Sequence, residues 1–287
     1  MQKQATDNHM EAIVQNMYQS TVGNVHNFLC QCQQCKLSAW EHQETFSIAF
    51  IRQGNFTFKV FRNDLDAFNG LFLVCKPGYE HRVGHVHEMP DQCTIFSFPA
   101  VHAEQLEEQG RELSWFLKNP DLHAVLIKAT PEMEYLHHRI FYLLQKPHFP
   151  RLWIEQMMLE LFSLVLSRGQ NKNIPPLTER QKRHHLPLIA AIKTFISNNF
   201  SEDISLPQLA AAGHLSPFHF NRLFKQMTGI TPYNYLLQVR LKEAHLQLRH
   251  SSQPVTHIAF DTGFNSLEHF SAAYKKQFGS SPSYARR

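Results

Sequence analysis

The sequence lacks several features that mark other classes of protein. No stretch approaches the roughly 20 uninterrupted apolar residues of a membrane-spanning helix. Residues 1–20 lack the apolar block of a signal peptide, since Lys3, Asp7 and Glu11 interrupt them. Five cysteines are an odd number, which does not suit a secreted disulfide framework. We therefore expect a cytoplasmic protein with reduced thiols and no membrane partner.

Motifs of catalysis are also scarce. The 11 glycines leave few places for a loop that cradles phosphate, and no H-E-x-x-H run or serine nucleophile elbow is present. This predicts a protein that is not an enzyme. The composition is otherwise that of a folded chain, with 43% hydrophobic and 18% charged residues, and 287 residues favour two domains.

Charge is distributed unevenly along the chain. From Leu177 onward the net charge is +7, whereas residues 1–176 carry −3, which together give the overall +4. A basic C-terminal part indicates a polyanionic partner there and a different role for the N-terminal part.

Residues 46–98 contain short alternating apolar runs, such as Phe46-Ile48-Phe50. Turn dipeptides separate the runs, namely Gly54-Asn55, Asn69-Gly70 and Pro77-Gly78. This pattern predicts β-hairpins that build a sandwich or a small barrel.

Helical spacing follows the predicted strands. One segment carries Leu136, Ile140 and Leu144, and the next runs from Trp153 to Val165 with a broad apolar face. That face needs a partner, which is either the β-domain of the same chain or the same helix of a second copy in a homodimer.

The polar stretch 169–185 contains Pro175-Pro176 and shows almost no apolar periodicity. We therefore predict an N-terminal domain over residues 1–170, a linker over 171–185 and a helical C-terminal domain over 186–287. The fold class is α+β, with a β-barrel or sandwich and trailing helices followed by an all-α domain.

The C-terminal region repeats itself at about fifty residues. The first unit runs from Leu209-Ala210 through Phe220 and Gly229, and the second runs from Ile258-Ala259 through Phe270 and Gly279. Each unit has a short helix, a tight turn with a small residue (Gly213 or Gly263) and a second helix. This plan predicts two helix-turn-helix units.

In the first unit, the spacing of Phe220, Leu223, Phe224 and Met227 places them on one buried face. The rest of that helix is predicted to meet DNA through Phe218, His219, Asn221, Arg222 and Lys225. Arginine pairs with guanine and asparagine with adenine in the major groove. A merely solvated polar face is the alternative, which the second copy makes less attractive.

The second unit is poorer in donors. Its predicted DNA-binding residues are Glu268, His269, Ser271, Lys275 and Lys276. We expect this unit to contribute mainly phosphate contacts and the first unit to read more of the base sequence. Between the units, residues 231–248 have the spacing of a rigid connecting helix.

These residues resemble the DNA-binding module of the AraC/XylS family. The resemblance covers about residues 186–287 and is carried by TGITPYNYL, RLKEA, IAFDTGF and YKKQFGSSP. It implies a transcription regulator that binds asymmetric promoter sites through helices in adjacent major grooves, with RNA polymerase as a further partner. Ala272 departs from the family, in which arginine is frequent there. The N-terminal half resembles a cupin-type domain that senses a small effector.

Histidines and cysteines of the N-terminal half form a candidate metal or redox site. His85 and His87 are one residue apart in a predicted strand, so both side chains lie on one face. The other candidates are Cys30, Cys32, Cys35, Cys75 and Cys93. Ordinary buried thiols and surface histidines are the simpler interpretation. A cupin-like metalloenzyme, with Glu88 or His81 as a third ligand, is the remaining alternative. The effector, the promoter and the choice between activation and repression stay open.

Overall fold

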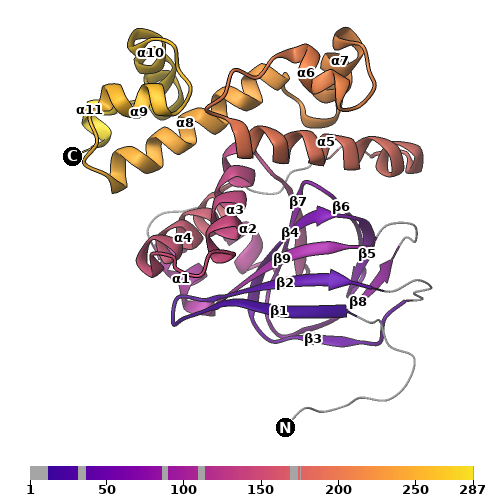
Figure 1. Ribbon diagram of the computed structural model, residues 1–287. Coiled ribbons are helices and arrows are strands. Elements are labelled where there is room, and N and C mark those ends of the chain that lie inside the picture. Colours follow the sequence, from indigo (N-terminus) through magenta and orange to yellow (C-terminus); the bar gives the residue numbers. More distant parts are fainter. Residues whose placement is uncertain are drawn as a thin grey trace. The chain divides into compact units, whose positions relative to one another are not determined.

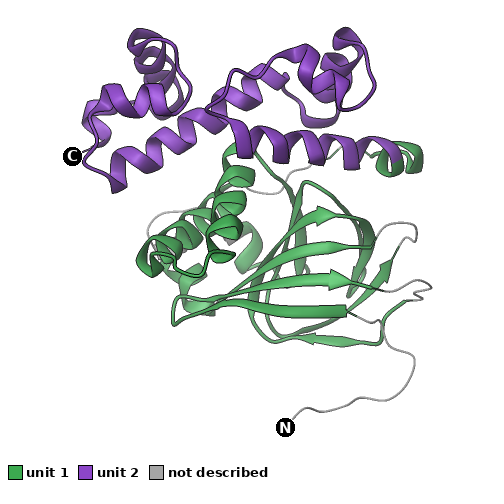
Figure 2. Ribbon diagram, in the orientation of Figure 1, with its two compact units in different colours: residues 1–183 green, residues 184–287 purple. Residues whose placement is uncertain are grey.

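The computed structural model describes residues 12–31, 37–85, 90–108, 114–168, 174 and 176–286. The chain divides into two compact units, residues 1–183 and 184–287, which are coloured separately in Figure 2. Unit 1 combines two β-sheets with helices, and the described residues of unit 2 form helices joined by turns. Among the described residues, no helix has the length and apolar character needed to cross a membrane.

The described strands of unit 1 form two antiparallel sheets. The larger has six strands in the order β1-β2-β9-β4-β7-β10, and the smaller has the order β3-β8-β5-β6. The strands are β1 (Ala12–Gln19), β2 (Asn24–Cys30), β3 (Glu41–Gln43), β4 (Phe46–Gln53), β5 (Asn55–Val60), β6 (Asn63–Phe68), β7 (Leu71–Cys75), β8 (Tyr79–His85), β9 (Gln92–Phe98) and β10 (Ala124–Lys128). The two sheets do not close into one barrel, so the fold is the sandwich form of the predicted α+β class (Figure 1).

The glycine turns of unit 1 do not make hairpins, so that part of the prediction is wrong. Gly54 and Gly78 connect a strand of the six-stranded sheet to one of the other sheet, and Gly70 connects back. All three have positive φ angles, from 86° to 95°. Glycine adopts these angles without steric cost, which lets the chain change sheets abruptly. Alternation alone cannot tell a hairpin from such a corner, because both connect strands of period two.

Helices α3 (Pro131–Leu144) and α4 (Arg151–Ser167) form where the helical spacing predicted them, and they pack on the six-stranded sheet. The Phe162 ring of α4 packs against Phe46 and Phe98, at centroid distances of 5.4 and 4.3 Å. His137 of α3 is fully buried, and its Nε2 lies 2.8 Å from the Thr94 hydroxyl. Burial holds the pKa of His137 well below its usual value. Because Phe162 of α4 packs on Phe46 and Phe98, the apolar face of this helix lies in the core of its own chain. Two short helices, α1 (Ala100–Glu108) and α2 (Ser114–Leu117), precede β10.

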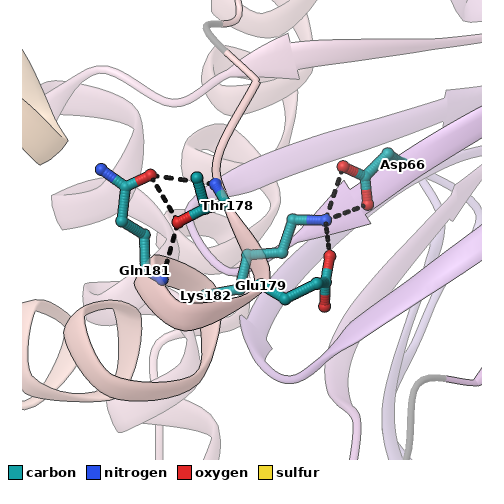
Figure 3. Close-up of polar contacts among 5 residues, drawn as sticks. All are labelled: Asp66, Thr178, Glu179, Gln181 and Lys182. Carbon is teal, nitrogen blue, oxygen red and sulfur yellow. Dashed lines mark hydrogen bonds and ion pairs between the residues drawn. The ribbon is translucent and has the colours of Figure 1, made fainter.

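Helix α5 (Glu179–Asn199) begins inside the stretch predicted as a linker. Thr178 and Gln181 form a reciprocal capping box, in which the Thr178 N–H donates to Gln181 Oε1 (2.9 Å) and the Gln181 N–H to Thr178 Oγ1 (3.3 Å; Figure 3). Residues 179–185 are therefore helical, and the T-x-x-Q signature was the sequence signal that could have shown it. Of the rest of the predicted linker, residues 171–173 and 175 lie outside the described residues.

Lys182 fixes the first turn of α5 to the β-sandwich. Its Nζ lies 2.8 Å from Asp66 Oδ1 on β6 and 3.0 Å from Glu179 Oε1 (Figure 3). Burial alone would lower the pKa of Lys182, but the two carboxylates outweigh it and raise the pKa. Helix α5 therefore starts on unit 1 and continues into unit 2.

Unit 2 consists of the remainder of α5 and six further helices. They are α6 (Leu206–Ala211), α7 (Pro217–Thr228), α8 (Pro232–His250), α9 (Val255–Asp261), α10 (Leu267–Phe278) and α11 (Pro282–Ala285). The pairs α6–α7 and α9–α10 are joined by the long helix α8 (Figure 1). The 19 residues of α8 correspond to about 28 Å.

Candidate nucleic-acid interface

Helices α6 and α7 form the first helix-turn-helix unit. Ser216 caps α7 by accepting a hydrogen bond from the His219 N–H, and Pro217 occupies the first helical position. Gly229 ends the helix in the left-handed conformation, with φ of 91°. Phe220, Leu223 and Phe224 are buried, and the Phe224 ring meets Tyr235 of α8 edge to face at 5.8 Å. Burial of one face fixes which side chains of α7 point outward.

Helices α9 and α10 repeat this plan with an offset of fifty residues in α10. Ser266 caps α10 through the His269 N–H (3.1 Å), and Gly279 ends it with φ of 75°. Phe270 and Tyr274 are fully buried and take the places of Phe220 and Phe224. The His245 Nδ1 lies 2.7 Å from the Tyr274 hydroxyl, and burial raises the pKa of Tyr274 to about 12. The predicted internal repeat is therefore a repeat of structure.

The two turns differ from the prediction in one detail. Gly263 has φ of 85°, but the residue with positive φ in the first turn is His214 (52°), not Gly213. Gly213 instead allows close packing, since a Cβ there would lie 2.8 Å from the Leu188 side chain of α5. The equivalence of Gly213 and Gly263 is thus wrong, because the offset before the turn is 49 residues and aligns Gly263 with His214.

The outward face of α7 carries a cluster of polar and aromatic side chains. Phe218 is 81% exposed, and His219, Arg222 and Lys225 are exposed as well. Asn221 is half-buried beside them. We call these five residues the α7 face. It offers an arginine fork, an amide and an ammonium group, which are donors for base edges and phosphates.

The corresponding outward residues of α10 form the α10 face. Glu268, His269, Lys275 and Lys276 are exposed, and Ser271 is half-buried. Ala272 is exposed at the position equivalent to Arg222. The two lysines lie in the last turn of the helix, and Glu268 lies in the first. This face therefore has ammonium groups but no arginine.

Arg240 of α8 holds the scaffold together, a role that its sequence position did not reveal. Its Nε donates to the Phe200 carbonyl (2.7 Å) and its Nη2 to the Glu202 carbonyl (2.8 Å). Burial lowers the pKa of Arg240. The guanidinium thus joins α8 to the end of α5. Hydrogen-bond partners forty residues away could not be read from periodicity.

The structure brings some of the cysteine and histidine candidates of unit 1 together, and others lie elsewhere. Cys30 and His85 come together with Asp91, which was not among the predicted candidates, and one ligand atom from each of the three residues lies within 4.8 Å of the other two. Cys75 lies on β7, paired with Ser47 of the neighbouring strand β4. Burial raises the pKa of Cys75 and the pKa of Cys93 to about 12. His81 is buried and stacks on Phe58 at 4.7 Å. Cys32, Cys35, His87 and Glu88 lie outside the described residues.

Known proteins match the C-terminal part of the chain. Residues 209–287 match the family described as a helix-turn-helix domain. The transcriptional activator RhaS of Escherichia fergusonii is 41% identical over 93 residues, which are 32% of this chain and 34% of that protein. RhaS of Klebsiella pneumoniae is 41% identical over 88 residues, 31% of this chain and 32% of the relative. The matched region spans about a third of the length of these relatives.

Solved structures were matched as well. The C-terminal domain of AraT from Geobacillus stearothermophilus is 31% identical, with a TM-score of 0.34, and the match covers 35% of this chain and 84% of that one. Fatty acid-bound ToxT from Vibrio cholerae is 11% identical, with a TM-score of 0.39, and the match covers 94% of this chain and 96% of ToxT.

The fold of unit 2 and the match over residues 209–287 define a protein with a helix-turn-helix domain. The identity to RhaS over this region agrees with the resemblance to the AraC/XylS DNA-binding module that the motifs indicated.

Proposed function

We propose that this protein is a transcription regulator that binds a specific site on duplex DNA through the α7 and α10 faces. The observation that carries the proposal is the structural repeat, in which two capped helices each bury an aromatic face and expose a polar one. Two such helices on one connector suit two successive major grooves. The net charge of +7 from Leu177 onward favours a polyanion as the partner.

The two faces would divide the work of recognition. On the α7 face, Arg222 is suited to guanine and Asn221 to adenine, each contact contributing about 1–3 kcal/mol of discrimination. Phe218 and His219 would make apolar and polar contacts beside them, and Lys225 would bind phosphate. On the α10 face, Lys275 and Lys276 would bind phosphates, while Glu268, His269 and Ser271 would provide limited base contact.

Unit 1 would supply the control of this activity. We propose that the sandwich binds a small effector and that the protein contacts RNA polymerase at promoters as an activator, which is what the matched RhaS proteins are named for. A homodimer also belongs to the proposal, but not through the apolar face of α4, because that face packs against the sheet of its own chain. Such a regulator would work where the chromosome is, in the cytoplasm, and would not be an enzyme.

Selection of bound sequences from a random duplex pool tests the proposal. The wild-type chain should enrich an asymmetric site with two half-sites about one duplex turn apart. Arg222→Ala should relax base preference in one half-site only. Arg62→Ala, which removes an exposed arginine from the β5–β6 turn of unit 1, serves as the control and should leave the selected site unchanged. Failure of the wild-type chain to enrich any sequence would overturn the proposal.

A second measurement distinguishes the transcription regulator from the alternative hypothesis, a cupin-like metalloenzyme. Purified protein should bind the selected duplex without consuming oxygen or a small organic acid. Turnover of either substrate, together with no DNA binding, would favour the enzyme.

A further inference from the structure

Three side chains from different parts of unit 1 meet at one end of the sandwich. Cys30 ends β2 of the six-stranded sheet, His85 ends β8 of the other sheet, and Asp91 stands directly before β9. One ligand atom from each, a thiol sulfur, an imidazole nitrogen and a carboxylate oxygen, lies within 4.8 Å of the other two. The His85 and Asp91 side chains are in addition paired with each other through Nδ1 and Oδ2, and both are almost completely buried.

The backbone around Asp91 fixes its carboxylate in this place. Oδ1 accepts a hydrogen bond from the Asn55 N–H (2.8 Å), and the Asp91 carbonyl accepts one from the Cys30 N–H (2.9 Å). Gly54 makes room for it, since a Cβ at that position would lie 2.7 Å from the Asp91 Cα. Asp91 is only 2% exposed. Asp91 is therefore preorganised by two neighbouring segments, residues 54–55 and the end of β2, with Oδ2 paired with His85.

We propose that Cys30, His85 and Asp91 bind a divalent transition-metal ion such as Zn²⁺. A thiolate and a carboxylate together carry two negative charges, which a divalent ion neutralises, and charge balance is what a buried site requires. Sulfur, nitrogen and oxygen ligands at 2.0–2.3 Å from zinc lie about 3.3–3.8 Å from one another in a tetrahedron, so small side-chain shifts would suffice.

Three protein ligands leave a fourth position of a tetrahedral ion open, which is the arrangement of an exchangeable site rather than of a closed structural one. Mixed sulfur, nitrogen and oxygen ligands suit Zn²⁺ or Co²⁺ better than Mg²⁺ or Ca²⁺, which prefer oxygen ligands alone. The site differs from the set expected from the sequence, because it contains Asp91 and does not contain Cys75.

Titration of the reduced, metal-free full chain with Co²⁺ tests this site without reference to DNA. Co²⁺ in a tetrahedral site with thiolate ligation gives visible d–d bands and a near-ultraviolet charge-transfer band. The wild-type protein should develop both bands with one equivalent per chain, and Zn²⁺ should displace the ion. Cys30→Ser should abolish the charge-transfer band.

Asp91→Asn keeps an acceptor for the Asn55 N–H and removes only the charge. It should weaken binding more than about tenfold, since even indirect partners of a metal contribute about 10–100-fold to affinity. Cys75→Ser is the matched control, because Cys75 is a buried thiol of the same sheet, and it should bind as the wild type does. Thermal unfolding of each variant shows whether it is folded, and Asp91→Asn carries the test if Cys30→Ser does not fold.

Two results would overturn the proposal. The first is a wild-type protein that shows no charge-transfer band at stoichiometric Co²⁺. The second is a band that persists in Cys30→Ser and disappears in the Cys32→Ser/Cys35→Ser double variant, because the thiolate would then come from another part of the chain.

Discussion

The two helix-turn-helix units share a scaffold and differ in what they expose. Ser216 and Ser266 cap the second helices, and Gly229 and Gly279 end them, each pair fifty residues apart. The buried aromatic positions match in the same way. The outward positions do not, since Arg222 corresponds to Ala272. Packing and capping fix the inner positions, whereas side chains facing solvent are free to differ in chemistry. The comparison teaches that the two pairs of helices differ in the side chains that they expose and not in the scaffold that holds them.

The equivalence of the two scaffolds is tested most strongly in their cores. Phe220→Ala and Phe270→Ala each remove a fully buried ring, and each should destabilise the helix-turn-helix that contains it by about 3–5 kcal/mol. Amide hydrogen exchange, measured separately for α7 and α10, reports the two effects. If only one of the two variants lost protection against exchange, the two helix-turn-helix scaffolds would not be equivalent.

The difference between the outer faces is tested by exchanging their chemistry. Arg222→Ala should lower affinity for the selected duplex by about 1–3 kcal/mol and relax base preference. Ala272→Arg should do the reverse and strengthen base preference in the other half-site. Both are measured by titration of the duplex and of single-base variants. If neither change altered base preference, the assignment of these helices to the groove would be wrong.

The helix caps provide a smaller and symmetrical test. Ser216→Ala and Ser266→Ala each remove the acceptor for one backbone N–H at the start of a helix, which costs about 0.5–2 kcal/mol. Similar shifts in the unfolding midpoint are expected for the two variants. Ser216→Asp and Ser266→Asp preserve an acceptor and should keep most of the stability, whereas equal losses for Ala and Asp would argue against capping.

The smallest expected effect concerns phosphate contacts of the α10 face. Lys276→Ala should weaken binding uniformly on all duplex sequences and reduce the slope of log affinity against log salt by about 1. Affinities measured at several salt concentrations on the selected site and on a random duplex give this slope. A loss restricted to the selected site would instead make Lys276 a base-reading residue.

Unit 2 was more predictable from the sequence than unit 1. The faces of its helices follow from residues three and four positions apart, so Phe220, Leu223 and Phe224 reveal the buried face of α7 by spacing alone. Strand pairing in unit 1 joins distant segments. The strands β1, β2, β3 and β10 were not predicted, and the order of the six-stranded sheet could not be derived from alternation. Nothing in the spacing of Gly54 or Gly78 says to which sheet the next strand belongs.

The candidate metal site shows the same limit. The sequence pointed to Cys30 and His85 by residue type but not to Asp91, whose carboxylate accepts a hydrogen bond from the N–H of Asn55 on β5. Asp91 and His85 flank one connection between strands, and that proximity was the one available signal. Residue type identifies candidates, but long-range backbone contacts decide which of them meet.

The sequence by itself determined the caps, the periodic buried faces and the repeat of unit 2, because helices and their ends depend on residues within a few positions of each other. Tertiary structure alone decided the crossing of the chain between the two sheets, the anchoring of Lys182 on Asp66 and the meeting of Cys30, His85 and Asp91. These contacts join residues from separate strands and helices, and their partners are selected by packing of the whole unit rather than by any local pattern.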